Sequence, residues 1–400
     1  MPWYRRMCYA LPANGEEHVL AGKIRVGVLF GGQSSEHEVS LASARSVMSA
    51  LDPEKYEVVP IGITKRGAWL TSGDAMSRLR AGDAGIGADA TPASLVPDLT
   101  SEGRAEIVQV SQGNAEAQVS QPLDVVFPVL HGPYGEDGTV QGVFQVANIP
   151  FVGAEVLGSA VGMDKDMMKK AFRDAGLHVV PYICVTRREW ERDPPSVQTL
   201  AEQKLRYPMF AKPANMGSSV GIGKIHGPQE FAAAVTQAAR YDRRIVIEQG
   251  VDAREFEVAV LGNDEPEASV VGEIVPGNEF YDYRAKYVDD NSELIIPARI
   301  PEYISQKIQD YAIRAFRAID ASGMSRVDFF VSRDLSQVWV NEINTIPGFT
   351  RISMYPKLWE ATGLPYSSLL DRLIELAIER HQDRKRNKEA LNDVGGSLDV

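Results

Sequence analysis

The chain has 400 residues, of which 44% are hydrophobic and 24% charged, proportions that exclude a disordered, collagenous or coiled-coil protein. At about 100–200 residues per domain, this length predicts two to four domains. The formal net charge of −12 argues against a general nucleic-acid binder, although a local basic pocket could still hold a small phosphate ligand.

Neither the cysteines nor the start of the chain indicates a secreted or membrane protein. Cys8 and Cys184 cannot build a disulfide framework, and no apolar run approaches the roughly 18 residues of a membrane-spanning helix. Residues 7–22 contain Pro12 and several polar residues, so they lack the apolar segment of a signal peptide. We therefore expect a soluble, cytoplasmic protein without a membrane partner, and an N-terminal extension over residues 1–22.

The first folded region is predicted to begin as a parallel sheet. Residues 24–30 form a short apolar run typical of a buried strand. A helical stretch over about 38–51 and a second strand over 56–63 complete a βαβ unit. Residues 66–120 are rich in Gly, Ala and Asp and are interpreted as an insertion, after which the buried-strand pattern resumes at 123–130.

The second half of the chain mixes strands and helices. One helix is predicted over 159–175, ended by Gly176, and residues 277–293 form a long loop of the kind that is usually functional or disordered. A charged tail is expected to fray from 384. Further strands are predicted at 179–185, 209–212, 244–249, 255–261, 269–275, 326–331 and 338–343, and further helices near 197–206, 228–241, 304–319 and 366–381.

The common nucleotide-binding signatures are absent from the sequence. Gly31-Gly32 follows the first strand without the third glycine of a dinucleotide-binding turn, and Gly221-x-Gly223 has His226 where that glycine is needed. Gly223-Lys224 is preceded at the required distance by Ser218, so it is not a P-loop. Neither a dehydrogenase nor a P-loop NTPase is supported.

Lys212 ends a predicted strand and precedes a loop of small residues that runs to Gly221. A lysine and the backbone N–H groups of such a loop can surround phosphate oxygens. Gly/Ser loops are common, however, and the loop taken alone favours an ordinary hairpin turn with a surface lysine.

The last two predicted strands carry Arg326-Val-Asp328 and Glu342-Ile-Asn344. Residues two apart on a strand share a face, so Arg326 lines up with Asp328, and Glu342 with Asn344. Oxygen ligands of this kind beside an arginine suit Mg²⁺, which binds carboxylates together with substrate phosphates. A solvated face with one ion pair is the alternative, but the apolar neighbours predict buried strands, where carboxylates need a counter-charge. A metal site is therefore favoured.

Three other polar segments each fit two interpretations. Glu36 follows the Gly31-Gly32 turn and either binds a ligand or merely suits the dipole of the next helix. His131 follows a buried strand, where loops form ligand crevices, but a lone histidine in a turn is more often structural. The loop that contains Lys286 and Tyr287 is either a contact loop or a lid that excludes water.

Taken in this order, the segments resemble the D-alanine–D-alanine ligases, which are ATP-grasp enzymes. The resemblance covers about residues 24–380, and seven ordered blocks are far more specific than any one of them. The blocks are Gly31-Gly-Gln-Ser-Ser-Glu36-His-Glu38-Val-Ser40, His131-Gly132 with Gly135-Glu-Asp-Gly138, Met163-Asp-Lys165, Lys212-Pro213 with Gly217-Ser-Ser-Val-Gly221, Phe280-Tyr-Asp-Tyr283 with Lys286-Tyr287, Arg326-Val-Asp328, and Asn341-Glu-Ile-Asn344-Thr with Pro347-Gly348.

The resemblance implies an α/β fold, a three-domain ATP-grasp ligase with an N-terminal parallel-sheet α/β domain. That domain would span 23–153 on the side of the first D-alanine. A central ATP-grasp subdomain would span 154–248, and a C-terminal one with the metal and the lid loop 249–385. Residues 386–400 would be a flexible tail.

The resemblance also implies the residues that bind ATP and metal. Lys165 and Lys212 would hold the phosphates and Lys286 would reach the γ-phosphate, while Glu248 would contact adenine and Glu255 the ribose. The ions would be Mg²⁺ or Mn²⁺, two per site. Their ligands would be Asp328, Glu342 and Asn344.

The amino-acid sites follow from the same resemblance. Glu36 would accept the ammonium of the first D-alanine within a hydrogen-bonded set that includes Ser218 and Tyr287. The remaining roles are His131 near the carboxylate of the first D-alanine, Arg326 and the Gly348 N–H as donors to the developing oxyanion, and Ser353 at the carboxylate of the second D-alanine.

The implied activity is ATP-dependent ligation of two D-alanines through a D-alanyl phosphate, with release of ADP and phosphate, for peptidoglycan precursor synthesis. A homodimer is implied as well. A D-alanine–D-lactate ligase is the nearest rival, although a tyrosine at position 287 favours the dipeptide. Ligases of other acids and amines and an inactive nucleotide-binding regulator are further alternatives, and the intact Arg326 and Asp328 argue against the last.

Overall fold

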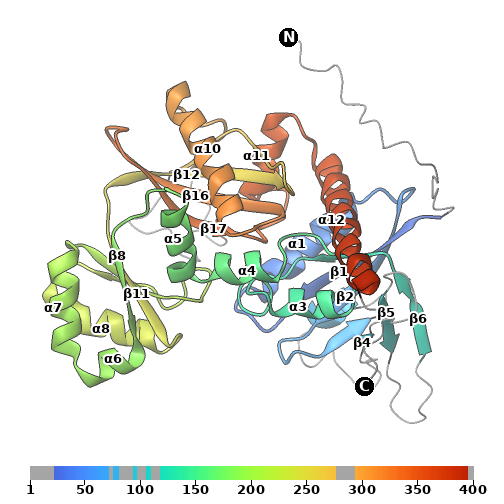
Figure 1. The fold of residues 1–400 in the computed structure, drawn as a ribbon, viewed down its shortest axis with the longest axis horizontal. Helices are drawn as coiled ribbons and strands as arrows, with labels where there is room; N and C mark the ends of the chain where they lie inside the picture. The colour runs from blue at the N-terminus through green and yellow to red at the C-terminus, as the bar shows by residue number, and fades with distance from the viewer. Residues whose placement is uncertain are drawn as a thin grey trace.

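Figure 1 shows the computed structural model of the chain, which describes residues 22–71, 75–80, 93–96, 105–109, 118–275 and 293–394. The N-terminal residues form the blue region, the central residues the green and yellow lobe, and the C-terminal residues the orange and red region. The predicted extension before Gly22 and the predicted loop before Glu293 lie outside the described residues.

The N-terminal region is a parallel sheet with helices, as the βαβ pattern predicts. The first strand lies between two parallel neighbours, with Val28 opposite both Pro60 and Phe127. Val28 and Phe30 are fully buried, as expected of a strand covered on both faces. The elements are β1 (Ile24–Gly31), α1 (His37–Ala50), β2 (Tyr56–Ile63), β7 (Val125–Pro128) and α3 (Thr139–Val146).

The segment interpreted as an insertion, 66–120, contains structure of its own where it is described. One short strand extends the N-terminal sheet in antiparallel fashion, and three others form a separate antiparallel sheet in the order β4-β5-β6. These elements are β3 (Trp69–Thr71), α2 (Ala75–Arg80), β4 (Ala93–Val96), β5 (Ala105–Gln109) and β6 (Gln118–Leu123).

The single helix predicted over 159–175 is wrong, because the chain breaks at Asp164 into α4 (Val156–Met163) and α5 (Lys165–Asp174). Asp164 is extended, and its carboxylate accepts hydrogen bonds from the N–H groups of Asp166 (3.1 Å) and Met167 (3.0 Å). Aspartate at such a position favours a new helix start. The break places Lys165 at the first residue of α5.

The central lobe is built on an antiparallel sheet in the order β10-β9-β11-β8. Lys212 lies on β9 and Glu248 on the neighbouring β11. Alternate residues of the strands pack with α8 in a separate apolar core. The elements are β8 (Tyr182–Thr186), α6 (Arg187–Arg192), α7 (Pro194–Lys204), β9 (Met209–Pro213), β10 (Gly223–Ile225), α8 (Pro228–Ala239) and β11 (Arg244–Gln249).

The C-terminal region contains a larger sheet in the order β15-β14-β12-β16-β17, with β13 also paired to β12. Helix α12 reaches Val394, beyond residue 384, from which the tail is predicted to fray. The elements are β12 (Ala253–Gly262), β13 (Glu267–Ala268), β14 (Gly272–Val275), β15 (Glu293–Ile295), α10 (Glu302–Ala318), β16 (Gly323–Ser332), β17 (Val338–Asn344), α11 (Met354–Thr362) and α12 (Tyr366–Val394).

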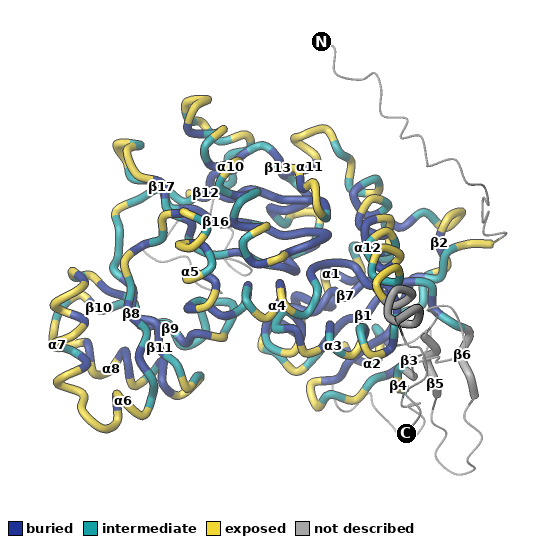
Figure 2. The backbone as a smooth tube through the Cα atoms, in the orientation of Figure 1, coloured by how far each residue is buried: buried dark blue, intermediate teal, exposed yellow. Residues whose placement is uncertain are grey.

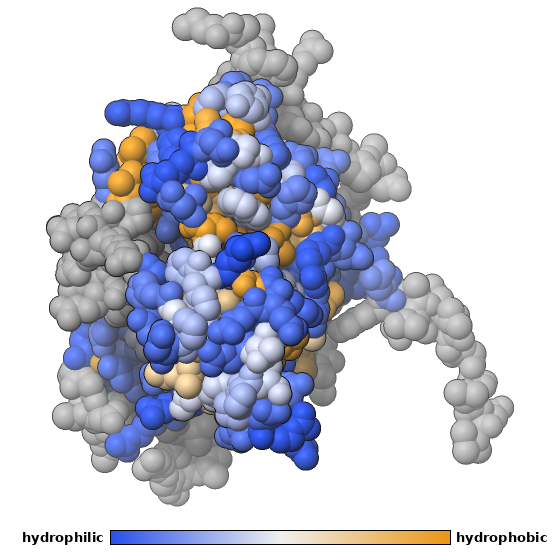
Figure 3. All heavy atoms as spheres, turned by 90° about the vertical axis from the view of Figure 1, so that its left-hand side faces the viewer, coloured by the Kyte–Doolittle hydropathy of each residue, from blue (hydrophilic) through white to orange (hydrophobic). Residues whose placement is uncertain are grey.

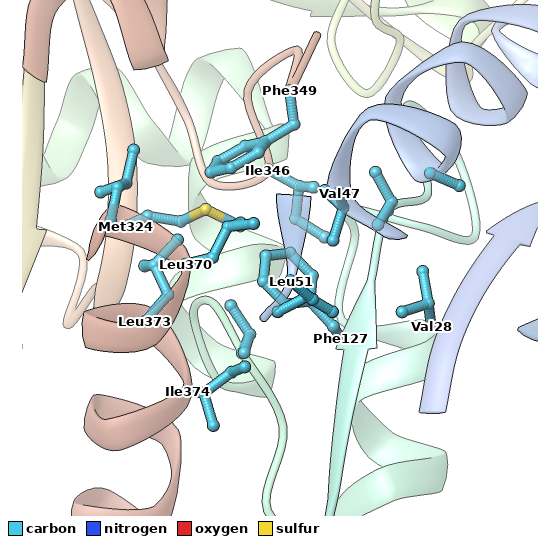
Figure 4. Packing of buried hydrophobic residues seen from close by; sticks show 14 of the residues in the cluster. Val28, Val47, Leu51, Phe127, Met324, Ile346, Phe349, Leu370, Leu373 and Ile374 are labelled. Atoms are coloured by element: carbon cyan, nitrogen blue, oxygen red, sulfur yellow. The ribbon is translucent and has the colours of Figure 1, made fainter. Parts of the chain in front are cut away.

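One hydrophobic core joins the two ends of the chain. Leu370, Leu373 and Ile374 of α12 pack in the same buried cluster as Phe127 of β7 and Met324 of β16, and Figure 4 shows these side chains converging. Helix α12 therefore ties the N-terminal sheet to the C-terminal sheet, and the loops at the ends of both sheets are held close together.

The surface is mainly polar, and burial concentrates in the strands. Figure 2 shows the sheet strands largely buried and the outer helices α6 and α7 largely exposed. The face in Figure 3 is mostly hydrophilic, with hydrophobic side chains gathered across its middle and upper part. Within the described residues, no helix has the length and apolar character needed to cross a membrane.

Because α12 fastens both regions, Leu373→Ala should destabilise the whole protein. A buried leucine truncated to alanine typically loses about 2–5 kcal/mol, so the melting temperature should fall by several degrees. Glu379→Ala on the exposed side of the same helix is the matched control and should change it little. Thermal unfolding of both variants tests this, and equal melting temperatures would contradict it.

Candidate active site

Two adjoining cavities lie where the three regions meet, and both are lined by Lys165, Ser219, Ile222 and Glu342. The first cavity, of about 100 Å³, is bordered by the loops that follow β1, β7, β9 and β17. The second, of about 600 Å³, lies between the central and C-terminal sheets, within the range of small-molecule sites. Residues predicted from the sequence line both cavities. Those of the first cavity are Glu36, His131, Ser218, Arg326, Asn344 and Gly348. Those of the second cavity are Lys212, Glu248, Glu255 and Asp328.

Glu36 and Ser218, far apart in the sequence, meet at the first cavity. Glu36 immediately precedes α1, and its side chain accepts a hydrogen bond from the Ser218 hydroxyl. Ser218 has a left-handed φ of +49°, which a serine adopts only when its surroundings hold it there. Small residues allow this approach, since a Cβ on Gly132 would lie 2.6 Å from Glu36 Oε2. The carboxylate is thus held at the cavity wall.

His131 is buried at the same cavity and links two regions of the chain. Its Nδ1 lies 3.0 Å from the Ile346 carbonyl, to which it must donate, so Nε2 can accept from the Ser43 hydroxyl at 3.2 Å. Burial lowers the pKa of His131, so the ring is neutral. These bonds satisfy the structural interpretation of His131, and its position in the cavity wall also fits the ligand interpretation.

Glu136 is a cavity residue that the sequence reasoning missed as a site residue, although it lies inside the Gly135-Glu-Asp-Gly138 block. Its Oε2 accepts a hydrogen bond from Gly132 N at 2.7 Å. Burial, together with the negative charge of Glu36, raises the pKa of Glu136 to about 8. Glu136 is therefore mostly protonated at neutral pH, which spares the cavity wall a second negative charge.

Two of the lysines that line the cavities, Lys165 and Lys212, bind oxygen atoms of the central lobe. Lys165 Nζ donates to the Met216 carbonyl at 2.6 Å, and Lys212 Nζ lies 2.8 Å from Glu248 Oε1. Burial alone would raise the pKa of Glu248, but the positive charges of Lys169 and Lys212 outweigh it and lower that pKa to about 2. The Glu248 carboxylate is thus occupied by lysines, and its predicted contact with adenine stays a prediction.

Lys169 is the second residue that sequence reasoning missed. It lies one helical turn after Lys165 on α5, and this spacing places both on one helix face. Its side chain is 1% exposed, and Nζ lies 2.9 Å from Glu248 Oε2. A periodicity argument applied to the Met163-Asp-Lys165 block would have found it.

The predicted charged strands are neighbours, and their site residues face each other. Arg326 pairs with Asn344, and Asp328 with Glu342, across β16 and β17. The guanidinium of Arg326 binds Asp328 through two hydrogen bonds of 2.7 Å and lies 3.0 Å from Glu257 of β12. Glu257 is a buried carboxylate that the sequence reasoning did not single out.

A β-bulge at Asn341 turns Glu342 and Asn344 toward the cavities. The pairing shifts from Phe329 opposite Val340 to Asp328 opposite Glu342, so Asn341 is the additional residue. Side chains alternate along a strand, so without the bulge Glu342 would lie on the core face of Val340. Bulges commonly re-aim side chains beside active sites in this way.

The donor types of Asp328, Glu342 and Asn344 fit a divalent cation. Among the residues that the structure describes, no three His, Cys, Asp or Glu side chains are grouped to hold a metal. The predicted set consists instead of two carboxylates and one amide on paired strands, and Mg²⁺ commonly binds one or two carboxylates together with substrate phosphates. These residues would therefore need phosphate oxygens to complete a metal site.

Of the remaining predictions, Gly348 lines the first cavity and lies beside Ser353, which immediately precedes α11. A Cβ on Gly348 would lie 3.1 Å from Ser353 Oγ, and that hydroxyl accepts from Thr350 N at 3.1 Å. Glu255 of β12 lines the second cavity. Lys286 and Tyr287 lie outside the described residues.

Comparisons with known proteins show the family of the chain. Two family models, described as the N-terminus and the C-terminus of D-ala D-ala ligase, match residues 25–154 and 171–375. A D-alanine–D-alanine ligase of Heliobacterium modesticaldum is 50% identical over 91% of this chain and 97% of its own length. A D-alanine–D-alanine ligase of Chloroherpeton thalassium is 52% identical over 92% of this chain and 99% of its own length. The chain belongs to the D-alanine–D-alanine ligase family.

Solved structures support the same family. The D-alanine–D-alanine ligase of Coxiella burnetii matches with a TM-score of 0.79 and 37% identity over 94% of this chain and 99% of that one. The D-Ala:D-Ser ligase VanG of Enterococcus faecalis matches with a TM-score of 0.77 and 36% sequence identity, and the match covers 89% of this chain and 100% of that one. The predicted ATP-grasp fold class is confirmed, and the D-alanine–D-alanine ligase family is ATP-dependent and uses a divalent metal.

Glu136→Gln should change how stability depends on pH. Folded Glu136 keeps its proton up to about pH 8, whereas the unfolded chain releases it near the ordinary value of 4.5. Between these values only the unfolded state loses the proton, so this group lowers wild-type stability as pH rises, by at most about 1.4 kcal/mol per unit. The melting temperature of the variant relative to wild type should therefore rise between about pH 5 and pH 8. A difference that stays constant over this interval would contradict the protonated carboxyl.

Proposed function

We propose that this chain is a D-alanine–D-alanine ligase that joins two D-alanines, with ATP converted to ADP and phosphate, for peptidoglycan precursor synthesis. The observation that carries this proposal is the pair of adjoining cavities with Lys165 and Glu342 in their common wall. The second cavity suits a nucleotide, and the first suits a small amino acid beside Glu36. A phosphoryl group and a carboxylate would then meet at the common wall.

The chemistry requires activation of a carboxylate, which is by itself a poor acyl donor. Transfer of the γ-phosphoryl group of ATP to the first D-alanine forms an acyl phosphate. The amine of the second D-alanine then attacks the acyl carbon, and phosphate leaves as the peptide bond forms. Lys165, Lys212 and Arg326 would offset the repulsion between phosphates and carboxylate, so catalysis rests on positioning and electrostatics. The acyl phosphate hydrolyses readily, so water must be excluded.

Divalent ions would supply further positive charge at the phosphates. We propose Mg²⁺ or Mn²⁺, two per site, held by Asp328, Glu342 and Asn344. The mixed carboxylate and amide donor set, turned toward the cavities by the Asn341 bulge, supports this assignment. Arg326 already neutralises Asp328 in part, so these residues tolerate burial before an ion binds.

The proposed amino-acid contacts follow the predicted roles. Glu36 accepts the ammonium group of the first D-alanine, and His131 lies near its carboxylate. Arg326 and the Gly348 N–H donate to the oxyanion, Ser353 binds the carboxylate of the second D-alanine, and Glu255 binds the ribose. Lys286 at the γ-phosphate and Tyr287 beside Glu36 and Ser218 are proposed from the family resemblance alone.

At the level of the whole protein, we propose domains over 23–153, 154–248 and 249–385. The boundary after 153 follows β7 and α3, and the boundary after 248 lies one residue before the end of β11. A homodimer in the cytoplasm is proposed from the family resemblance, and light scattering of the purified protein tests the dimer.

Phosphate release from ATP and Mg²⁺ should depend on D-alanine. We expect release with D-alanine and dipeptide in equal amount, and only background release with L-alanine or without an amino acid. Parallel assays of phosphate and dipeptide measure both products. Tight ATP binding without any D-alanine dependence would keep the fold and exclude the proposed substrate.

A D-Ala:D-Ser ligase is the second candidate, because a structure of such an enzyme matches this chain with a TM-score of 0.77. Competition of D-alanine with D-serine, and with D-lactate, for the second position separates the candidates. Predominant D-alanyl-D-alanine near neutral pH is expected, and a predominant mixed product would assign the chain to the rival class.

Arg326→Ala should lower kcat by about 10²–10³-fold, the usual effect of losing one oxyanion donor. The same change at Arg372, which pairs with the exposed carboxylates of Glu375 and Glu379, is the matched control and should leave kcat unchanged. The melting temperature is measured alongside, because Arg326 also neutralises Asp328 and Glu257. Less than a tenfold loss in folded protein would refute the role.

A further inference from the structure

Lys169 is buried behind the wall of the second cavity rather than in it. Its Nζ has two polar partners, the Glu248 carboxylate at 2.9 Å and the Asn341 carbonyl at 3.3 Å, and lies 5.8 Å from the centre of the Tyr182 ring. Lys169 lines neither cavity, whereas Lys212 and Asn341 both line the second one. Lys169 therefore acts on a ligand through its charge and through these neighbours rather than by direct contact.

The first neighbour, Glu248, is shared between two lysines. Its Oε1 binds Lys212 and its Oε2 binds Lys169. With Lys212 alone, the carboxylate would cancel the positive charge that Lys212 presents to the cavity. With a protonated Lys169 behind it, the three groups carry a net charge of +1. Burial lowers the pKa of Lys169, and the negative charges of Glu248 and Glu342 oppose that shift. Lys169 thus offsets Glu248 and preserves the attraction of Lys212 for an anion.

The second neighbour is the bulge. Asn341 is the additional residue that turns Glu342 and Asn344 toward the cavities, and its carbonyl accepts from Lys169. The Lys169 ammonium group on α5 therefore contacts both Glu248 of β11, which binds Lys212, and β17, the strand that carries two of the proposed metal ligands.

We propose that Lys169 is a positioning residue of the nucleotide site, which keeps Lys212 electrostatically available to phosphates and holds the bulge that orients Glu342 and Asn344. This inference deepens the proposed function and rests on it only for the presence of a nucleotide in the second cavity. A packing role alone would not need a charge, because buried ion pairs are seldom more stable than apolar side chains of similar volume.

The test is a double-mutant cycle with Lys169→Met and Glu248→Gln, and Mg-ADP is the probe, so that D-alanine is not needed. Lys169→Met leaves Glu248 to neutralise Lys212 and should weaken Mg-ADP binding about tenfold or more. Adding Glu248→Gln removes that carboxylate and should restore binding at least about threefold, a coupling of the size expected for contacting charges. Lys170→Met is the matched control: Lys170 is half-exposed on the same helix, and binding should not change.

Titration calorimetry gives the affinities, and thermal unfolding separates folding from binding. The proposal is contradicted if Lys169→Met lowers the melting temperature without weakening Mg-ADP binding. It is also contradicted if the double variant binds Mg-ADP as weakly as Lys169→Met does. If Lys169→Met does not fold, the double variant decides, because it should bind within about threefold of Glu248→Gln. If Mg-ADP binds and the cycle behaves as expected but no D-alanine is ligated, the proposed substrate fails and the role of Lys169 stands.

Discussion

A buried cation is stable only beside a counter-charge, and two adjoining cavities here are lined or backed by Lys165, Lys169, Lys212 and Arg326. If every one of these cations were neutralised by a carboxylate, no positive charge would remain to attract phosphate. Two arrangements avoid complete neutralisation. Glu248 is shared by two lysines, which leaves one positive charge over, and Asp328 binds Arg326 while still lining the second cavity. Protonated Glu136 follows the same logic, since it adds polar contacts without another negative charge.

The geometry of the site comes from interruptions of regular structure. Asp164 ends one helix and begins another, so that Lys165 lies at a helix start beside both cavities. The bulge at Asn341 reverses the side-chain alternation of β17, and the left-handed backbone of Ser218 lets its hydroxyl reach Glu36. Each irregularity lies between well-packed elements, which can hold a strained position in place. Helix α12 then keeps the N-terminal loops against the C-terminal ones.

Much of this was predictable from the sequence, for identifiable reasons. The two-residue spacing of Arg326 and Asp328 correctly placed them on one face, because strand alternation is local. The break at Asp164 was missed because apolar periodicity runs through it, although an aspartate before Lys165 is a capping signal. The reversal of side-chain alternation at Asn341 could not be predicted from the sequence, because a bulge depends on how the strand pairs with its neighbour. The four-residue spacing from Lys165 places Lys169 on the same helix face, but its partners Glu248 and Asn341 are distant in the sequence and could not be predicted.

The shared wall of the cavities also bears on the order of events. Lys165 and Glu342 border both spaces, and Lys169 contacts both the carboxylate behind Lys212 and the strand of Glu342. A nucleotide bound by Lys212 would therefore act on the same charge cluster that contacts the strand of the proposed metal ligands. Since coupling between two sites is reciprocal, binding of nucleotide and of metal should strengthen each other. The first cavity would then receive its amino acid beside phosphates that are already neutralised, which suits a reaction whose main obstacle is the repulsion between like charges.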